Sequence, residues 1–316
     1  MVVDVDVGVG IFGALTGIEE WRLRMGKKIA VGIDGSRVGY RALSMARQVM
    51  DPKEDTVVCL HVGGAKGYGV EVLKAECEDR VRWSKMEWVP VLKLPGESTA
   101  GALARAAREL GDESTVLCVG AYGRKGEVMQ TFGHVVDGSL RTSGLNTLVV
   151  KSQSRMFGGV DDELGAKQEA AKGTATSVNA MFFTDLSAVS LKGLAQVMRV
   201  CKPEDKITVA WVDTKNAIGV FPPGHKDRTV EALKRHGFKN VSCIGIPSAR
   251  DEENNTPLSV PDTIMNYIDE HDVELAIVTK SGESSMSKEA YARVLGSCSD
   301  AVCQGARCAV LVVDGN

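Results

Sequence analysis

Three glycines near the middle of the chain have a spacing that suits phosphate binding. Two residues separate Gly120 from Gly123, nine residues separate Gly123 from Gly133, and His134 then opens a predicted helix. Glycines let a phosphate approach the backbone closely, and a helix N-terminus supplies unpaired N–H groups and a favourable dipole. The segment is therefore a candidate phosphate loop. The alternative interpretation is a flexible connection whose glycines only turn and cap the chain.

A second glycine motif lies close to the N-terminus and indicates a different chemistry. Gly8, Gly10 and Gly13 form a G-x-G-x-x-G pattern after a strand-like segment, and Asp34 follows about twenty residues later, as a dinucleotide-binding fingerprint requires. However, two aspartates alternate through that strand-like segment, which should be buried on both faces. An NAD-type enzyme remains an alternative. The simpler interpretation is that these glycines belong to an N-terminal extension without a binding role.

Other chemistry finds little support in the sequence. The five histidines are scattered and none pairs with Cys, Asp or Glu at a metal-ligand spacing. The eight cysteines lie mostly in apolar segments without a C-x-x-C motif, which is typical of buried free thiols in a reducing compartment. We expect no catalytic residue and no metal site, and at most slow ATP hydrolysis.

Strands and helices alternate along two stretches of the chain. In the first, we predict strands at 29–33, 56–62, 88–93, 115–120 and 147–150, and helices at 37–50, 69–82, 98–110 and 133–142. In the second, we predict strands at 178–184, 206–212, 240–246, 273–279 and 308–313, and helices at 187–201, 226–236, 259–271 and 296–305. This alternation predicts two doubly wound α/β domains, each with a five-stranded parallel sheet.

The two stretches match each other at both ends. IAVGIDGS aligns with AMFFTDLS, and GHVVDGSLRTSGLNTLVV aligns with GSCSDAVCQGARCAVLVV. A segment of small and polar residues without a helix or strand pattern separates them. We therefore predict an N-terminal extension at 1–26, a first domain at 27–151, a linker at 152–176 and a second domain at 177–316.

The glycine spacing, the GIDGS segment and the terminal TLVV strand together resemble the universal stress protein family. Nucleotide-binding members of that family carry G-x2-G-x9-G followed by Ser or Thr after the fourth strand. The resemblance extends over about 27–151 and 177–314, which leaves the extension and the linker outside it. It implies a flavodoxin- or Rossmann-like domain of the adenine nucleotide alpha hydrolase type, in a stress-response or signalling protein.

The resemblance places ATP or AMP, with or without Mg²⁺, mainly in the first half. It implies that Asp34 lies near the adenine and ribose and that the backbone at Val62 contacts the base. The three glycines of the loop would surround the ribose and phosphates. His134 departs from the family pattern because it stands where Ser or Thr would contact a phosphate, although an imidazole could donate a hydrogen bond there.

The second half keeps only part of this pattern. Thr279 replaces the first glycine, and the loop before the last helix is four residues longer than in the first half. We therefore expect weaker nucleotide binding or none. The retained candidates are Asp185, Val212, Gly282, Gly296 and Ser297.

Composition and charge narrow the possible partners. A net charge of −3 without a basic tract argues against nucleic acid. The N-terminus lacks a basic region typical of a signal peptide and no segment is long enough to span a membrane, so we expect a cytoplasmic protein. In the family, paired domains join through their last strands, which implies that Thr147 to Val150 lie beside Ala309 to Val313. Whether the chain also forms a homo-oligomer is left open. A nucleotide-free interaction scaffold is the third functional alternative.

Overall fold

The computed structural model describes most of the two predicted α/β stretches. The described residues are 26–63, 69–81, 85–111, 115–123, 132–151, 177–213, 219–248, 250, 256–280 and 295–313. The N-terminal motif of Gly8, Gly10 and Gly13, the segment 152–176 and Gly282 lie outside them.

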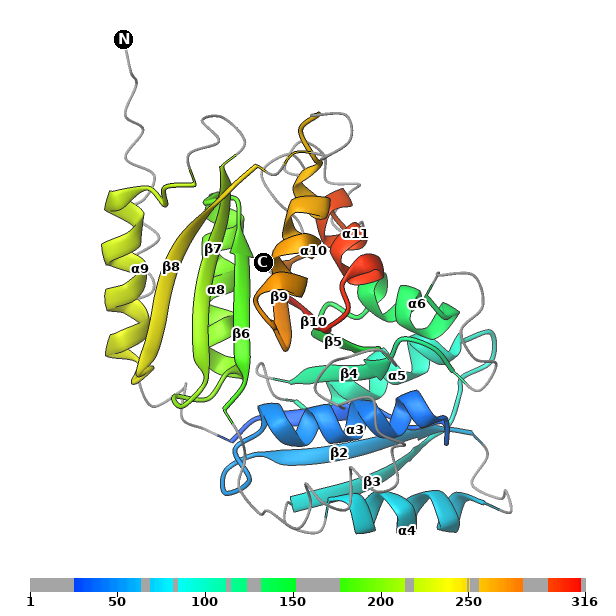
Figure 1. The fold of residues 1–316 in the computed structure, drawn as a ribbon. Coiled ribbons are helices and arrows are strands. Elements are labelled where there is room, and N and C mark those ends of the chain that lie inside the picture. Colours follow the sequence, from blue (N-terminus) through cyan, green and yellow to red (C-terminus); the bar gives the residue numbers. More distant parts are fainter. Residues whose placement is uncertain are drawn as a thin grey trace.

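The described strands form one ten-stranded sheet in the order β3-β2-β1-β4-β5-β10-β9-β6-β7-β8. Neighbouring strands are parallel except at the centre, where β5 and β10 are antiparallel and Val149 lies opposite Val310. The strands are β1 (Lys28–Gly32), β2 (Thr56–Val62), β3 (Lys85–Val91), β4 (Val116–Gly120), β5 (Asn146–Val150), β6 (Asn179–Thr184), β7 (Lys206–Asp213), β8 (Asn240–Pro247), β9 (Leu275–Thr279) and β10 (Ala309–Val313). The α/β class with a mostly parallel sheet is as predicted. Figure 1 shows how strongly the sheet twists, since β6 to β8 run steeply across the direction of β2 and β3.

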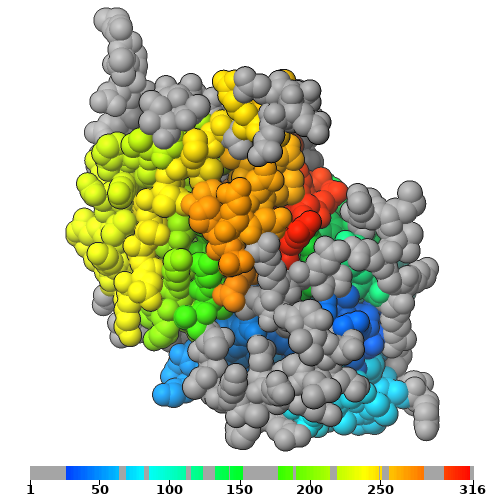
Figure 2. Space-filling view, viewed as in Figure 1, coloured from blue at the N-terminus to red at the C-terminus, as the bar shows by residue number. Residues whose placement is uncertain are grey.

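The helices cover both faces of this sheet, as in doubly wound folds. They are α3 (Arg37–Val49), α4 (Val70–Arg80), α5 (Thr99–Glu109), α6 (His134–Thr142), α8 (Ala188–Val200), α9 (Pro223–Arg235), α10 (Val260–Glu270) and α11 (Ser297–Gly305). Helices α3, α4, α8 and α9 contribute to one apolar cluster, and α5, α6, α10 and α11 contribute to the other. Figure 2 shows α10 and α11 side by side on one face of the molecule, in orange and red. None of the described helices is long and apolar enough to cross a membrane.

Serine caps start the helix after the first and the third strand of each half. Ser98 accepts the Gly101 N–H on its hydroxyl at 3.0 Å, and Ser36 accepts the Gly39 N–H at the same distance. In the second half, Ser187 and Ser259 cap α8 and α10 in the same way. A serine hydroxyl satisfies one of the N–H groups that a helix start leaves unpaired.

A buried aspartate at the start of the second strand is another feature that both halves share. Asp55 accepts the Lys27 N–H at 2.8 Å and the Asp51 N–H at 2.7 Å. Asp205 accepts the Val178 N–H at 2.8 Å in the equivalent position. Each carboxylate thus ties the start of one strand to the start of its neighbour, because it accepts a backbone donor that precedes the adjacent strand.

The starts of two predicted elements are wrong by three residues. Strand β3 covers Lys85–Val91 rather than 88–93, because Lys85 and Glu87 are exposed on an edge strand and hide its β pattern. Helix α9 begins at Pro223 rather than at residue 226, because proline fits the first helical position, where no N–H donor is needed.

Candidate functional site

A cavity of about 680 Å³ opens in the first half, where β1, β2 and β4 end. This volume lies within the range of small-molecule sites. Its apolar wall includes Leu60, Val62, Leu103 and Val119, and its polar positions come from the turn after β1, the glycine loop and the first turn of α6. Ligands of open parallel sheets bind at this end of the strands, because loops and helix N-termini meet there.

All six residues predicted for the first site line this one cavity. They come from three separate parts of the chain: the turn after β1, the end of β2, and the segment from the end of β4 into α6. They are Asp34, Val62, Gly120, Gly123, Gly133 and His134.

The Asp34 carboxylate lies in a narrow slot between two glycines. One oxygen, Oδ1, accepts the Ser36 N–H at 2.9 Å. A Cβ atom added at Gly39 would lie 3.0 Å from Oδ1, and one added at Gly123 would lie 3.1 Å from Oδ2. Larger residues at either position would therefore press on the carboxylate, so these glycines let Asp34 stay beside the loop.

Backbone hydrogen bonds hold the glycine loop at both of its ends. The Ala121 N–H donates to the Val150 carbonyl at 2.7 Å, and the Gly133 N–H donates to the Ala121 carbonyl at 3.1 Å. The exit of the loop is therefore pinned next to its entrance. Residues 124–131 lie outside the described residues.

The N-terminus of α6 provides donors for an anion. Gly133 is the N-cap, has an extended backbone and offers no side-chain cap. The first intrahelical bonds run from Val136 and Asp137 to the Gly133 carbonyl, so the N–H groups of His134 and Val135 have no acceptor in the helix. Both residues line the cavity. Together with the helix dipole, these N–H groups favour a negatively charged group.

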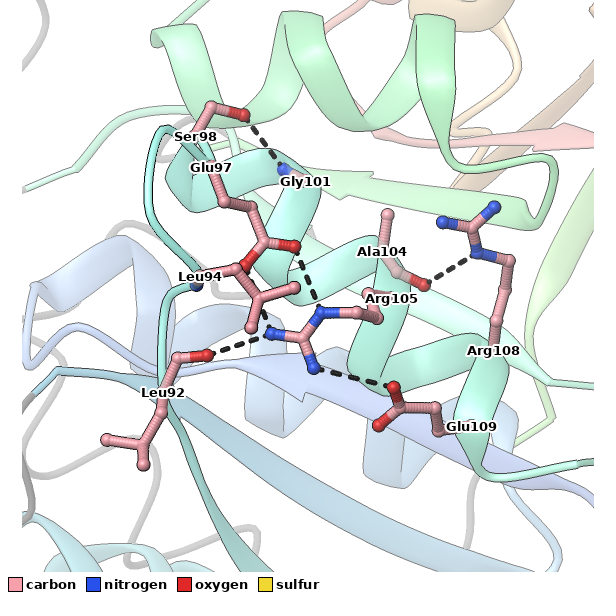
Figure 3. A network of polar contacts seen from close by, with 9 residues as sticks. All are labelled: Leu92, Leu94, Glu97, Ser98, Gly101, Ala104, Arg105, Arg108 and Glu109. Carbon is pink, nitrogen blue, oxygen red and sulfur yellow. Dashed lines mark hydrogen bonds and ion pairs between the residues drawn. The ribbon is translucent and has the colours of Figure 1, made fainter.

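Helix α5 forms another part of the cavity wall and is anchored by a polar network. Its Thr99 and Leu103 line the cavity. In Figure 3, Arg105 reaches back to the segment before the helix, where it binds the Glu97 carboxylate at 3.0 Å and the Leu92 carbonyl at 2.8 Å. Hydrogen bonds from Arg105 and from the Leu94 N–H, in that order of effect, lower the pKa of Glu97 to about 2.

The equivalent place in the second half differs from the first site. Gly296 caps α11 and Ser297 is its first residue, as the sequence predicts. Asp185 is exposed, whereas Val212 is only 9% exposed. Burial, and to a smaller extent Asp185, raise the pKa of Cys298 to about 11, which keeps this thiol protonated near neutral pH.

The replacement of Gly120 by Thr279 is compensated on the neighbouring helix. In the first half, a Cβ atom at Gly120 would lie 2.8 Å from the Val38 backbone. In the second half, Thr279 has a side chain at this position and Gly193 of α8 makes room, since a Cβ there would lie 2.6 Å from the Thr279 methyl. The small residue has moved from the strand to the helix. Ser190 also replaces the glycine that flanks Asp34 in the first half.

The sequence reasoning missed several residues of the site. Gly39, Thr99 and Leu103 line the cavity but belong to no predicted motif. The Ser98 cap places the start of α5 in the sequence, yet only the folded chain brings that turn to the cavity. His61, one of the five scattered histidines, is half-buried and stacks on Trp88 with ring centroids 5.9 Å apart.

No family model and no curated protein sequence matches the chain. Solved structures do resemble it. A universal stress protein from Archaeoglobus fulgidus DSM 4304 is 12% identical with a TM-score of 0.52, covering 92% of this chain and 98% of that one. A candidate universal stress protein from Pseudomonas aeruginosa UCBPP-PA14 is 10% identical with a TM-score of 0.51, covering 93% and 95%. At such low identity, these similarities show a shared fold.

Proposed function

We propose that the chain binds an adenine nucleotide, ATP or AMP, in the cavity of its first half and acts in stress response or signalling. One observation carries the proposal: a single cavity joins an apolar wall, a carboxylate in a glycine slot and an uncapped helix N-terminus. An apolar wall suits a base, a carboxylate suits ribose hydroxyls, and free N–H groups suit phosphates. The likeness in fold to solved universal stress proteins supports the same proposal.

Each end of the nucleotide has its own residues in this proposal. The adenine lies against Leu60 and Val62, and the Asp34 carboxylate accepts hydrogen bonds from ribose hydroxyls. The phosphates contact the backbone of Gly123 and Gly133 and the first turn of α6. The imidazole of His134, which is exposed at the cavity, donates to a phosphate oxygen in place of a hydroxyl. Mg²⁺, if it accompanies ATP, binds through the phosphates.

The nucleotide binds mainly in the first half. Thr279 and Ser190 place side chains where the first half has glycines, which supports weaker binding around Asp185, Gly296 and Ser297. Val212 and Gly282 are the other two residues proposed for this second site. We also propose that the halves are duplicated domains at 27–151 and 177–316, with 152–176 as the linker; the repeated serine caps and Asp55 and Asp205 support this division.

Gly133→Ala is the sharpest test of nucleotide binding. Among the described residues, the atom nearest to a Cβ at Gly133 is the Ala121 carbonyl oxygen at 3.6 Å, so these residues accommodate it. The added methyl group would instead meet a phosphate that approaches the backbone. We expect ATP and AMP to raise the melting temperature of the wild-type protein, and this shift to fall by more than half in the variant, because stabilisation follows ligand affinity.

Gly224→Ala is the matched control, since no atom of the described residues lies within 4 Å of a Cβ atom there. It should leave the nucleotide-dependent shift unchanged. The scan should include NAD. A shift with NAD alone would overturn the proposal in favour of the N-terminal motif of Gly8, Gly10 and Gly13. A wild-type protein that no nucleotide stabilises would favour the scaffold.

A further inference from the structure

A backbone amide of the candidate site lacks its expected partner in the sheet. The last pair between β1 and β2 is Gly32 with Leu60, and the last bond runs from the Ile33 N–H to the Leu60 carbonyl at 2.9 Å. A parallel ladder would next direct the Val62 N–H to the Ile33 carbonyl. Among the described residues this bond is not formed. Because Val62 lines the cavity, its N–H is available to a ligand.

His61 occupies the carbonyl that Val62 would otherwise use. Its Nδ1 lies 2.8 Å from the Ile33 carbonyl oxygen. Since a carbonyl oxygen only accepts hydrogen bonds, Nδ1 carries the proton in this contact. The ring stacks on Trp88 at an interplanar angle of 19°, and a Cβ atom at Gly63 would lie 2.9 Å from Nε2. The imidazole is therefore held in this orientation by its surroundings.

The second half shows the same ladder without a histidine. Trp211 stands at the position of His61, and the ladder continues by one more pair, Thr184 with Trp211. The bond from the Lys206 N–H to the Val178 carbonyl sets which β7 amides face β6. By this alternation, the amide that pairs with the Thr184 carbonyl is that of Val212. The backbone donor that is free in the first half is thus used within the sheet of the second.

We infer that His61 is a positioning residue, which caps the Ile33 carbonyl and so keeps the Val62 N–H free for a hydrogen-bond acceptor of the ligand. The inference rests on the proposed function and refines it. The acceptor is a ring nitrogen of the base, because the apolar residues Leu60 and Val62 form this part of the wall. It also gives a physical reason for binding in one half, since a used amide cannot recognise the base.

Hydrogen exchange of single amides tests, without any ligand, whether His61 keeps the Val62 N–H free. In the nucleotide-free wild-type protein, the Val62 amide should exchange at least about tenfold faster than the Val212 amide, since only the latter is bonded within the ladder. His61→Phe keeps a ring against Trp88 but removes the donor. The Ile33 carbonyl is then released, and the Val62 amide should become protected. His61→Asn restores a donor and should return the amide to fast exchange.

Nucleotide titration of the same variants then tests the link to binding. The affinity for AMP should fall about tenfold in His61→Phe and recover in His61→Asn, at a temperature where all variants are folded. A purely structural role of His61 would change the melting temperature and leave the affinity of the folded protein unchanged. Trp211→Phe makes the corresponding change in the second half and should alter neither measurement in the first.

Slow exchange of the Val62 amide in the nucleotide-free wild-type protein would overturn the inference. So would AMP binding by His61→Phe with wild-type affinity. The exchange of the Val62 amide could respond to the His61 variants as expected while the protein binds no nucleotide. This result would support the effect of His61 on the Val62 amide and refute the proposed function instead.

Discussion

At the scale of single residues, the three loop glycines serve different purposes. Gly120 is required by packing, because a Cβ atom there would lie 2.8 Å and 2.9 Å from the Val38 carbonyl carbon and oxygen. Backbone atoms cannot move aside as the end of a flexible side chain can. Gly133 has an ordinary extended backbone and room for a methyl group. The described residues therefore give no packing reason for a glycine at this position, which fits the approach of a ligand.

Gly120→Ala should lower the free energy of unfolding by about 1–3 kcal/mol, the usual effect of overpacking a well-packed position. Urea unfolding without nucleotide measures it, with Gly133→Ala as the reference that should stay close to wild type. Equal stability of the two variants would show that the close contact between β4 and α3 relaxes easily, and would remove the distinction between the two glycines.

At the scale of elements, the start of α5 is fixed by one guanidinium group. Arg105 binds Glu97 and the Leu92 carbonyl outside the helix, and Glu109 at 3.4 Å inside it (Figure 3). Glu97 in turn accepts the Leu94 N–H at 2.9 Å. The network therefore sets how the chain enters the helix that carries Thr99 and Leu103 to the cavity.

The contribution of this network to stability should depend on pH. The folded-state pKa of Glu97 lies at about 2, below its ordinary value of 4.5. The stabilisation of the fold by the charged Glu97 carboxylate is therefore complete above pH 4.5 and is lost as the pH falls towards 2. Glu97→Gln should be less stable than wild type at pH 7, and the difference should shrink on acidification. Glu109→Gln, which removes only the bond within the helix, serves as control in urea unfolding. A difference for Glu97→Gln that is constant with pH would refute this assignment.

At the scale of the whole molecule, side chains from each half contact the other on both sides of the central strand pair. Asn146 of β5 donates to the Gln196 amide oxygen of α8 at 3.0 Å. Lys151, which directly follows β5 and is 5% exposed, donates to the carbonyls of Gln304 and Ala306 at 2.8 Å and 2.6 Å. A cation from one half thus caps the C-terminus of α11 in the other, where the helix dipole favours positive charge.

Lys151→Met should lower the free energy of unfolding by about 2 kcal/mol, because it leaves carbonyls at the end of α11 without their charged donor. The measurement is urea unfolding at neutral pH. Lys239→Met is the matched control, since Lys239 is 71% exposed and lies 4.0 Å from Glu204. Its effect should stay within about 0.5 kcal/mol. Comparable losses in both variants would argue against a specific role of Lys151.

Local patterns in the sequence were sufficient for the fold class and picked out six residues that line one cavity. Strand β2 and the start of α3 lie at the predicted residues, because β-branched runs and a serine cap act over short distances. The glycine spacing and Asp34 led to the cavity, because parallel strands bring their carboxyl ends to one edge of a sheet. Exposure of alternate residues on the edge strand β3 obscured its start.

Only the tertiary structure shows how the cavity of the first half is built and how the second half differs from it. Whether a glycine serves packing or a ligand depends on atoms far away in the sequence, as Gly120 and Val38 show. The contact of His61 with the Ile33 carbonyl depends on where the ladder between β1 and β2 stops. The fit of Thr279 against Gly193 depends on helix α8 lying against strand β9. The sequence alone determined the alternation of elements and the motif spacing, which are local properties; distances between separate segments arise only when the chain is folded.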